Sequence, residues 1–82
     1  MKKIFESEFH GWNESCECVH VYELESEDDF WLFDEMTHEE KCEYFNVHDE
    51  SGRAAPGTSY RTYDFELTTK HVIMFETFAI NV

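Results

Sequence analysis

A long segment without any basic residue constrains this chain more than any other feature. Between Lys3 and Lys41 lie 37 residues that contain thirteen carboxylic acids and neither lysine nor arginine. From Arg53 to Val82, by contrast, three bases balance three acids. The net charge of -13 is therefore concentrated in the first two-thirds of the chain, where mutual repulsion opposes compaction. Any fold must accommodate this polarised distribution.

The composition still favours a folded protein. Hydrophobic residues make up 41% of the chain and aromatic residues 17%, and large rings supply much buried area per residue. Disordered segments of high net charge lack such residues. A chain of 82 residues is typical of one domain, which buries only about 60% of the surface that its unfolded form exposes. We expect a single domain that spans residues 1–82.

Several features predict a cytoplasmic protein without membrane contact. No apolar run approaches the roughly 18 residues that a membrane span needs. The N-terminal segment meets Glu6 and Glu8 too early to be a secretory signal. The three cysteines are an odd number, which fits a reducing compartment better than a disulfide framework.

The first part of the chain reads as two strands and one or two helices. Residues 2–10 alternate between two faces, and residues 16–25 form a second strand rich in valine and tyrosine, which predicts a hairpin across a turn at Gly11–Ser15. Ser26 is a candidate N-cap followed by three acids. The apolar cluster within 27–36 fits either a short helix or a buried strand.

A second helix and two further strands are predicted after this cluster. Thr37 to Glu40 matches a capping box, and residues 41–45 continue as a helix. Residues 46–59 form a loop, with 51–57 as its exposed part. Strands follow at 60–67 and 71–82, joined by a tight connection at 68–70. The last strand is apolar on both faces, which indicates either a central strand or a strand with one face covered by the helix. We expect an α+β fold, β-β-α-β-β, with an antiparallel sheet of about four strands and one or two short helices on one face.

The acids form the main candidate binding surface. Along a strand, acids at i and i+2 lie about 6.6 Å apart on one face, whereas each DNA strand shows a phosphate per about 3.4 Å of axis. One strand alone therefore does not reproduce the phosphate density, and the acids after residue 26 would supply a second row. Ordinary soluble surfaces mix both signs of charge, although a charge run is also typical of a solvated face. The predicted surface comprises Glu6, Glu8, Glu23, Glu25, Glu27, Asp28, Asp29, Asp34, Glu35, Glu39 and Glu40.

Cysteine and histidine residues offer a candidate zinc site. On a strand Cys16, Cys18 and His20 project from one face. On a helix His38 and Cys42 are i, i+4 neighbours. Zinc takes such ligands in fours, so Cys16, Cys18, His38 and Cys42 form one possible set, although their spacing matches no standard zinc pattern. Buried free cysteines are also ordinary packing residues. We therefore predict no metal or other cofactor, and a zinc-stabilised domain stays as an alternative.

The sequence favours a binding protein over an enzyme. It contains no phosphate loop, no G-x-S-x-G turn and no EF-hand loop, and a catalytic cysteine–histidine pair lacks a recognisable third group. Six bases against nineteen acids disfavour direct binding to nucleic acid.

In size and charge the chain is similar to small acidic phage proteins that inhibit host DNA-binding enzymes, such as anti-restriction and anti-CRISPR proteins and uracil-DNA glycosylase inhibitors. No motif carries this similarity, so it assigns no residue a role. It implies a DNA-mimic inhibitor, acting in the host cytoplasm if phage-encoded, with a basic DNA- or RNA-binding host protein as partner: a nuclease, a restriction complex or a CRISPR-type complex. The alternative is a small protein–protein interaction module without mimicry, which would use an apolar patch around Trp12 or the Gly52–Gly57 loop.

Overall fold

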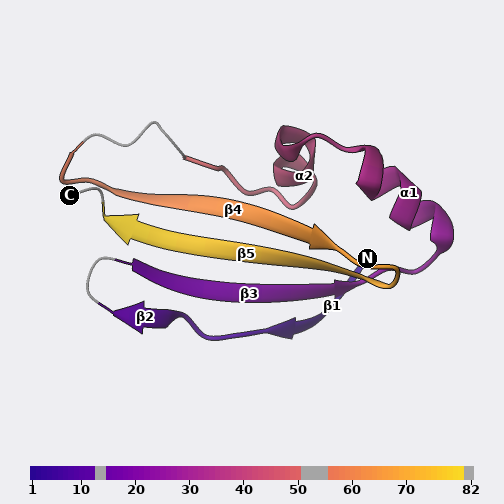
Figure 1. Ribbon diagram of the computed structural model, residues 1–82, viewed down its shortest axis with the longest axis horizontal. Coiled ribbons are helices and arrows are strands. Elements are labelled where there is room, and N and C mark those ends of the chain that lie inside the picture. Colours follow the sequence, from indigo (N-terminus) through magenta and orange to yellow (C-terminus); the bar gives the residue numbers. More distant parts are fainter. Residues whose placement is uncertain (13–14, 51–55, 81–82) are drawn as a thin grey trace.

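The chain forms a small α+β fold, as predicted (Figure 1). The computed structural model describes residues 1–12, 15–50 and 56–80. Its elements are β1 (Lys2–Glu6), β2 (His10–Trp12), β3 (Ser15–Glu23), α1 (Glu27–Glu35), α2 (His38–Tyr44), β4 (Ser59–Leu67) and β5 (His71–Ile80). Among the described residues, none of the helices is long and apolar enough to cross a bilayer.

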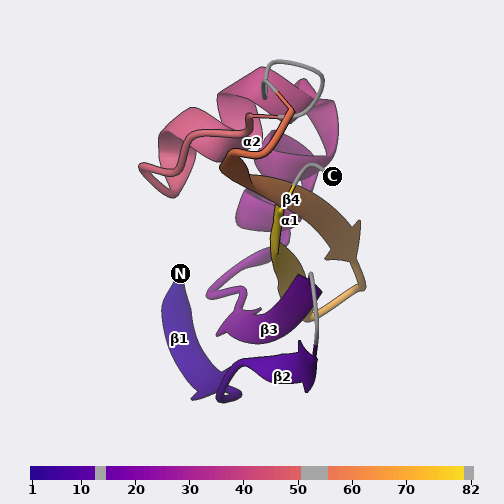
Figure 2. The ribbon, with the colours of Figure 1, turned by 90° about the vertical axis from the view of Figure 1, so that its left-hand side faces the viewer.

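The strands form one antiparallel sheet in the order β1-β3-β5-β4, with β2 also paired to β3. The predicted central position of the last strand is confirmed, because β5 pairs with β3 on one side and β4 on the other. Figure 2 shows that the sheet curves strongly between β1 and β4. β3 pairs with β5 from Ser15 opposite Ala79 to Glu23 opposite His71, and β4 pairs with β5 over an equal length.

The predicted N-terminal hairpin is confirmed, but its first strand is divided and both strands extend into the segment predicted as a turn. The register shifts between Lys3 and Phe5, and residues 7–9 separate β1 from β2. Gly11 and Trp12 belong to β2, opposite Cys16 and Ser15, so the expected turn at Gly11–Ser15 is wrong at both ends. Gly11 has a φ of +137°, and a Cβ there would lie 2.4 Å from the carbonyl oxygen of Ser15. Only glycine permits that approach.

The cluster at residues 27–36 is a helix, which settles the alternative between helix and strand. The Ser26 side chain accepts a 3.2 Å hydrogen bond from the Asp29 amide, and three acids occupy the first turn of α1. Both features stabilise a helix start. One aromatic side chain of α1 faces inward: Phe33 is 1% exposed, whereas Trp31 and Leu32 are 54% and 58% exposed.

Local hydrogen bonds define both ends of α2. The predicted capping box is present, because Thr37 and Glu40 exchange side-chain-to-amide bonds of 3.0 and 3.2 Å. At the other end Asn46 has a φ of 55°. The amides of Asn46 and Val47 bond to the carbonyls of Glu43 and Cys42 at 3.0 and 2.9 Å. This is a Schellman motif, and it turns the chain back along the helix.

Both helices contribute to a core on one face of the sheet. Cys42 of α2 packs with Tyr63 of β4 and Met74 of β5, and half-buried apolar side chains surround these three. The Phe33 ring of α1 lies edge-on to Phe65, with centroids 6.1 Å apart. On the opposite face, Val19, Val21, Ile73 and Phe75 pair across β3 and β5 and are only half-buried.

We expect Phe33→Ala to lower the free energy of unfolding by about 3–5 kcal/mol, because it removes a buried ring from the helix–sheet contact. Trp31→Ala, on the same helix, should cost less than about 1 kcal/mol because that side chain is largely exposed. Urea denaturation followed by circular dichroism measures both values. Equal losses for the two variants would contradict the packing of α1 described above.

Candidate functional site

The eleven acids predicted as a binding surface, here called the acidic surface, lie in contact with solvent. Ten are exposed and Asp29 is half-buried. Within the described part of the chain, only Glu6 and Glu25 of this set form ion pairs, Glu6 with Lys3 and His20, and Glu25 with the N-terminus. The hydrogen bond from Lys3 lowers the pKa of Glu6. Of the other nine carboxylates, Asp29 and Glu40 accept hydrogen bonds from the amides of Glu25 and Thr37.

The acids of α1 have opposite effects at its two ends. Glu27, Asp28 and Asp29 occupy the first turn, where the helix dipole favours negative charge. Asp34 and Glu35 occupy the last turn, which contains no basic residue. There the dipole disfavours each carboxylate by about 0.3–1 kcal/mol. Asp34 and Glu35 therefore lower the stability of the helix that carries them.

An apolar groove of about 650 Å³ adjoins the acidic surface. Leu24, Phe30 and Trp31 line it, together with Glu23, Glu25, Ser26, Glu27, Thr69 and Lys70. The end of β3, the start of α1 and the connection between β4 and β5 form this groove. All three lie at one end of the molecule, on the right in Figure 1. Charged and aromatic side chains are therefore presented together.

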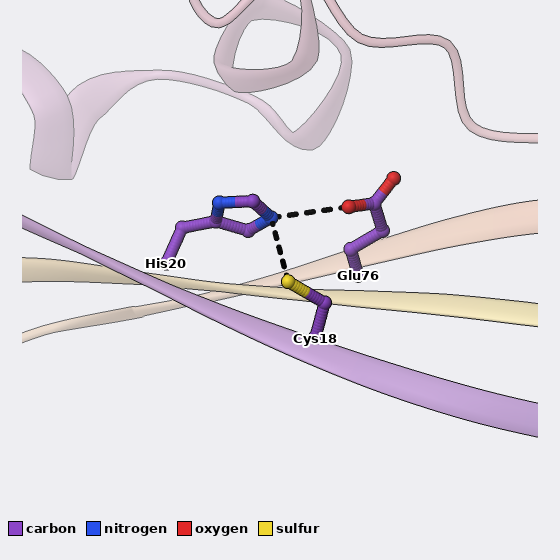
Figure 3. A group of neighbouring side chains, drawn as sticks. All are labelled: Cys18, His20 and Glu76. Carbon is purple, nitrogen blue, oxygen red and sulfur yellow. Dashed lines mark hydrogen bonds and ion pairs between the residues drawn. The ribbon is translucent and has the colours of Figure 1, made fainter. Parts of the chain in front are cut away.

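A second candidate site is a buried group of Cys18, His20 and Glu76 (Figure 3). These residues are 3%, 7% and 7% exposed. His20 Nε2 lies 3.0 Å from Glu76 Oε1 and 3.4 Å from Cys18 Sγ. Cys18 and Glu76 are direct partners across β3 and β5, and His20 follows on the same face of β3. The sheet register thus brings the three side chains together.

Further polar groups surround this buried group. Tyr63 Oη and Arg61 Nη1 donate hydrogen bonds to Glu76 Oε2 at 2.9 and 3.2 Å. Burial and the neighbouring Glu76 raise the pKa of Tyr63. His20 Nδ1 lies 2.9 Å from Glu6 Oε1, an ion-pair distance, but it has no hydrogen bond of good geometry among the described residues. Cys18 Sγ donates to the Ser7 carbonyl at 3.1 Å.

Sequence reasoning missed Glu76, although a signal was present. Glu76 occupies the face of β5 that otherwise carries Val72, Met74 and Phe78, so it interrupts an apolar row of a central strand. An acid in such a position is buried, and a buried acid needs partners. Its partner His20 lies 56 positions earlier in the chain, and among nineteen acids nothing local connects the two.

A third group, on α2 and the segment after it, contains His38, Cys42 and Asp49. His38 Nε2 lies 2.7 Å from Asp49 Oδ2 and 3.8 Å from Cys42 Sγ. The Schellman turn at Asn46 returns the chain to this position, and the Tyr63 amide donates to Asp49 Oδ2 at 3.3 Å. Burial, followed by the negative charges of Asp49 and Glu39, raises the pKa of the Cys42 thiol.

In a nucleophilic relay the cysteine contacts one imidazole nitrogen and the orienting carboxylate contacts the other. In the Cys42 group the sulfur and the Asp49 carboxylate both approach Nε2, so that arrangement is not met. In the Cys18 group the sulfur and the Glu76 carboxylate approach Nε2, and Glu6 lies 2.9 Å from Nδ1 without a hydrogen bond of good geometry. Cys18 is only 3% exposed, so its sulfur is not accessible to a substrate from solvent. Three donor atoms that converge on one region are instead typical of metal ligands.

The four residues of the zinc set predicted from sequence are not assembled in the described part of the chain. Cys18 belongs to one group, His38 and Cys42 belong to the other, and Cys16 belongs to neither. The spacing argument placed Cys16 and Cys18 correctly on one face, but Glu76 and Asp49 come from elements that the cysteine pattern does not reveal. The Trp12 side chain and residues 51–55 of the predicted loop site lie outside what the structure describes.

Comparisons with protein-family models, with curated proteins and with solved structures find no match to this chain.

We expect Cys42 to react with a thiol-alkylating reagent at pH 8 at least about tenfold more slowly than Cys16, because burial and a raised pKa both reduce accessible thiolate. Cys16 is half-buried, whereas Cys18 and Cys42 are buried. Pulsed alkylation with peptide mass spectrometry separates the three sites, and urea-unfolded protein provides the control. Equal native rates for Cys16 and Cys42 would contradict the packing of α2.

Proposed function

We propose that this protein is a non-enzymatic inhibitor that binds a basic nucleic-acid-binding protein through its acidic surface. One observation carries the proposal: Asp34 and Glu35 occupy the end of α1 where negative charge is unfavourable, and no base offsets them. A surface selected only for solubility gains nothing from that position, since acids elsewhere serve equally well. Sites that lower stability are common where function requires them.

The mechanism follows from charge and from exposed aromatic surface. Carboxylates of the acidic surface take the place of phosphates in the partner's nucleic-acid channel, and displaced counterions favour association. Charge mainly accelerates encounter and selects the partner. Affinity then comes from desolvated anchors, among which tryptophan is frequent. Trp31 and Leu32 are exposed on the same helix as five of the acids.

The proposed partners are host nucleases and restriction or CRISPR-type complexes, and the proposed setting is phage anti-defence in the host cytoplasm. If the acidic surface mimics DNA, duplex DNA and this protein compete for the same site on the partner, so that binding of one excludes the other.

A second candidate function is a protein–protein interaction module without mimicry. The groove lined by Leu24, Phe30 and Trp31 favours it, because a concave apolar site accepts an anchor side chain whatever the partner's charge. Trp31→Ala should then weaken binding more than removal of charge does, and added salt should have little effect. Under mimicry, binding must weaken steeply as salt rises.

We expect Asp34→Asn with Glu35→Gln to raise the midpoint of thermal unfolding by about 3–8 °C, because it removes two charges from the negative end of the α1 dipole. The same variant should weaken binding to the partner about tenfold, which equals about 1.4 kcal/mol. Differential scanning calorimetry measures the first effect. Titration against a panel of purified nucleases and restriction and CRISPR complexes, with duplex DNA as competitor, measures the second.

Two further variants distinguish an effect of the acidic surface on binding from an effect of total charge. Asp64→Asn with Glu66→Gln also removes two exposed acids, but from β4, and it should leave binding within about twofold. Glu23→Gln with Glu25→Gln, Asp28→Asn and Asp29→Asn should weaken binding further and also lower stability, since Asp28 and Asp29 support the start of α1. Salt-independent binding, or equal losses in the α1 and β4 double variants, would refute the proposal.

A further inference from the structure

We propose that Cys18, His20 and Glu76 form a Zn²⁺ site that joins β3 to β5. This inference goes beyond the proposed function and is independent of it. The donor atoms are Cys18 Sγ, His20 Nε2 and a carboxylate oxygen of Glu76, all within 4.8 Å of one another. Thiolate, imidazole and carboxylate are the three protein ligand types that zinc accepts.

The distances between the donor atoms fit a tetrahedral ion. With Zn–N and Zn–O near 2.0 Å and Zn–S near 2.3 Å, tetrahedral geometry places nitrogen and sulfur about 3.5 Å apart, and nitrogen and oxygen about 3.3 Å apart. The structure has 3.4 Å between Sγ and Nε2 and 3.0 Å between Nε2 and Oε1. Each pair requires a displacement of only a few tenths of an ångström.

The surrounding groups match the outer partners of a metal centre. Histidine ligands donate their second nitrogen to a carboxylate or a carbonyl, which sets the tautomer. His20 Nδ1 faces Glu6 Oε1 at 2.9 Å, and in the described residues this buried nitrogen has no other partner. The second carboxylate oxygen of Glu76, Oε2, accepts hydrogen bonds from Tyr63 and Arg61. Glu76 is thus held by two hydrogen bonds, and Glu6 lies where it can receive the Nδ1 proton of His20.

The charges also balance. Zinc binding releases the thiol proton of Cys18 to solvent, and the thiolate and the Glu76 carboxylate then neutralise the two charges of Zn²⁺. Of the flanking charges, Glu6 is paired with Lys3, and Arg61, whose side chain is 50% exposed, bonds to Glu76. A buried cluster in which charges cancel avoids the cost of an uncompensated charge in the interior.

The Cys18 group suits zinc better than the group on α2. In the latter, the corresponding distances of 3.8 and 2.7 Å deviate in opposite directions from a regular tetrahedron, and the side chain of His38 is 50% exposed. A metal at Cys18, His20 and Glu76 would clamp the central strands beneath α2. Small domains often gain stability from a metal in this way, since their cores are limited.

The test is titration of the reduced, metal-free protein with Co²⁺ and then Zn²⁺. We expect one equivalent of Co²⁺ to bind, with a thiolate-to-cobalt charge-transfer band and tetrahedral visible bands that Zn²⁺ abolishes. Zinc at 100 times its dissociation constant should raise the thermal midpoint by about 10–20 °C. Glu6→Gln, which alters the outer partner of His20, should weaken binding about 10–100-fold.

Cys16 and Cys42 provide matched controls for the ligand. Cys18→Ser and Cys18→Ala should each remove the charge-transfer band, while Cys16→Ser, on the same face of β3, and Cys42→Ser should keep it. Circular dichroism of the metal-free variants shows whether they fold, and Glu76→Gln gives a second test if both Cys18 variants unfold. Absence of stoichiometric binding, or a band that is lost in Cys42→Ser and kept in Cys18→Ser, would overturn the proposal.

Discussion

The register between β3 and β5 is the constraint on which the rest of the structure depends. It joins the acidic first part of the chain to the neutral last part and sets which face of each strand meets the helices. Met74 reaches the core beneath α2 and Glu76 reaches His20 only in this register. Because side chains alternate along a strand, a slip of one residue would turn every one of them to the opposite face.

The same register places a buried acid beside an apolar core. An ionised carboxylate in the interior is costly unless it is paired and hydrogen-bonded. Glu76 meets both conditions through His20, Tyr63 and Arg61. Its partners come from the two strands beside it, β3 and β4, so the polar group specifies the arrangement of the sheet as well as any ligand chemistry. Charge outside the core follows another rule: in α1 the first-turn acids stabilise the helix, and Asp34 and Glu35 oppose it. Helix stability alone explains the first-turn acids, but it does not explain Asp34 and Glu35.

The features predicted correctly from sequence are those that neighbouring residues decide. Ser26 and Thr37 cap helices because their hydroxyls reach amides three positions ahead. The alternation of β4 and β5 predicted their strands for a similar reason. The apolar run within α1 left helix and strand open, since only packing selects Phe33 as the buried ring. The register shift within β1 was missed because such an irregularity depends on the partner strand, and the break at residues 7–9 between β1 and β2 was missed as well. Of the candidate sites, the acidic surface was predicted as exposed. The approach of Cys18 and Glu76 to His20 was not predicted.

By itself the sequence determined the fold class, the helix caps, the central position of the last strand and the segregation of charge, because each follows from spacing, local hydrogen bonds or composition. Tertiary structure alone decided that β3 is the second neighbour of β5, that Phe33 is buried, and that Cys18, His20 and Glu76 meet. Those contacts join residues far apart in the chain, and they form only when the strands pair in one register.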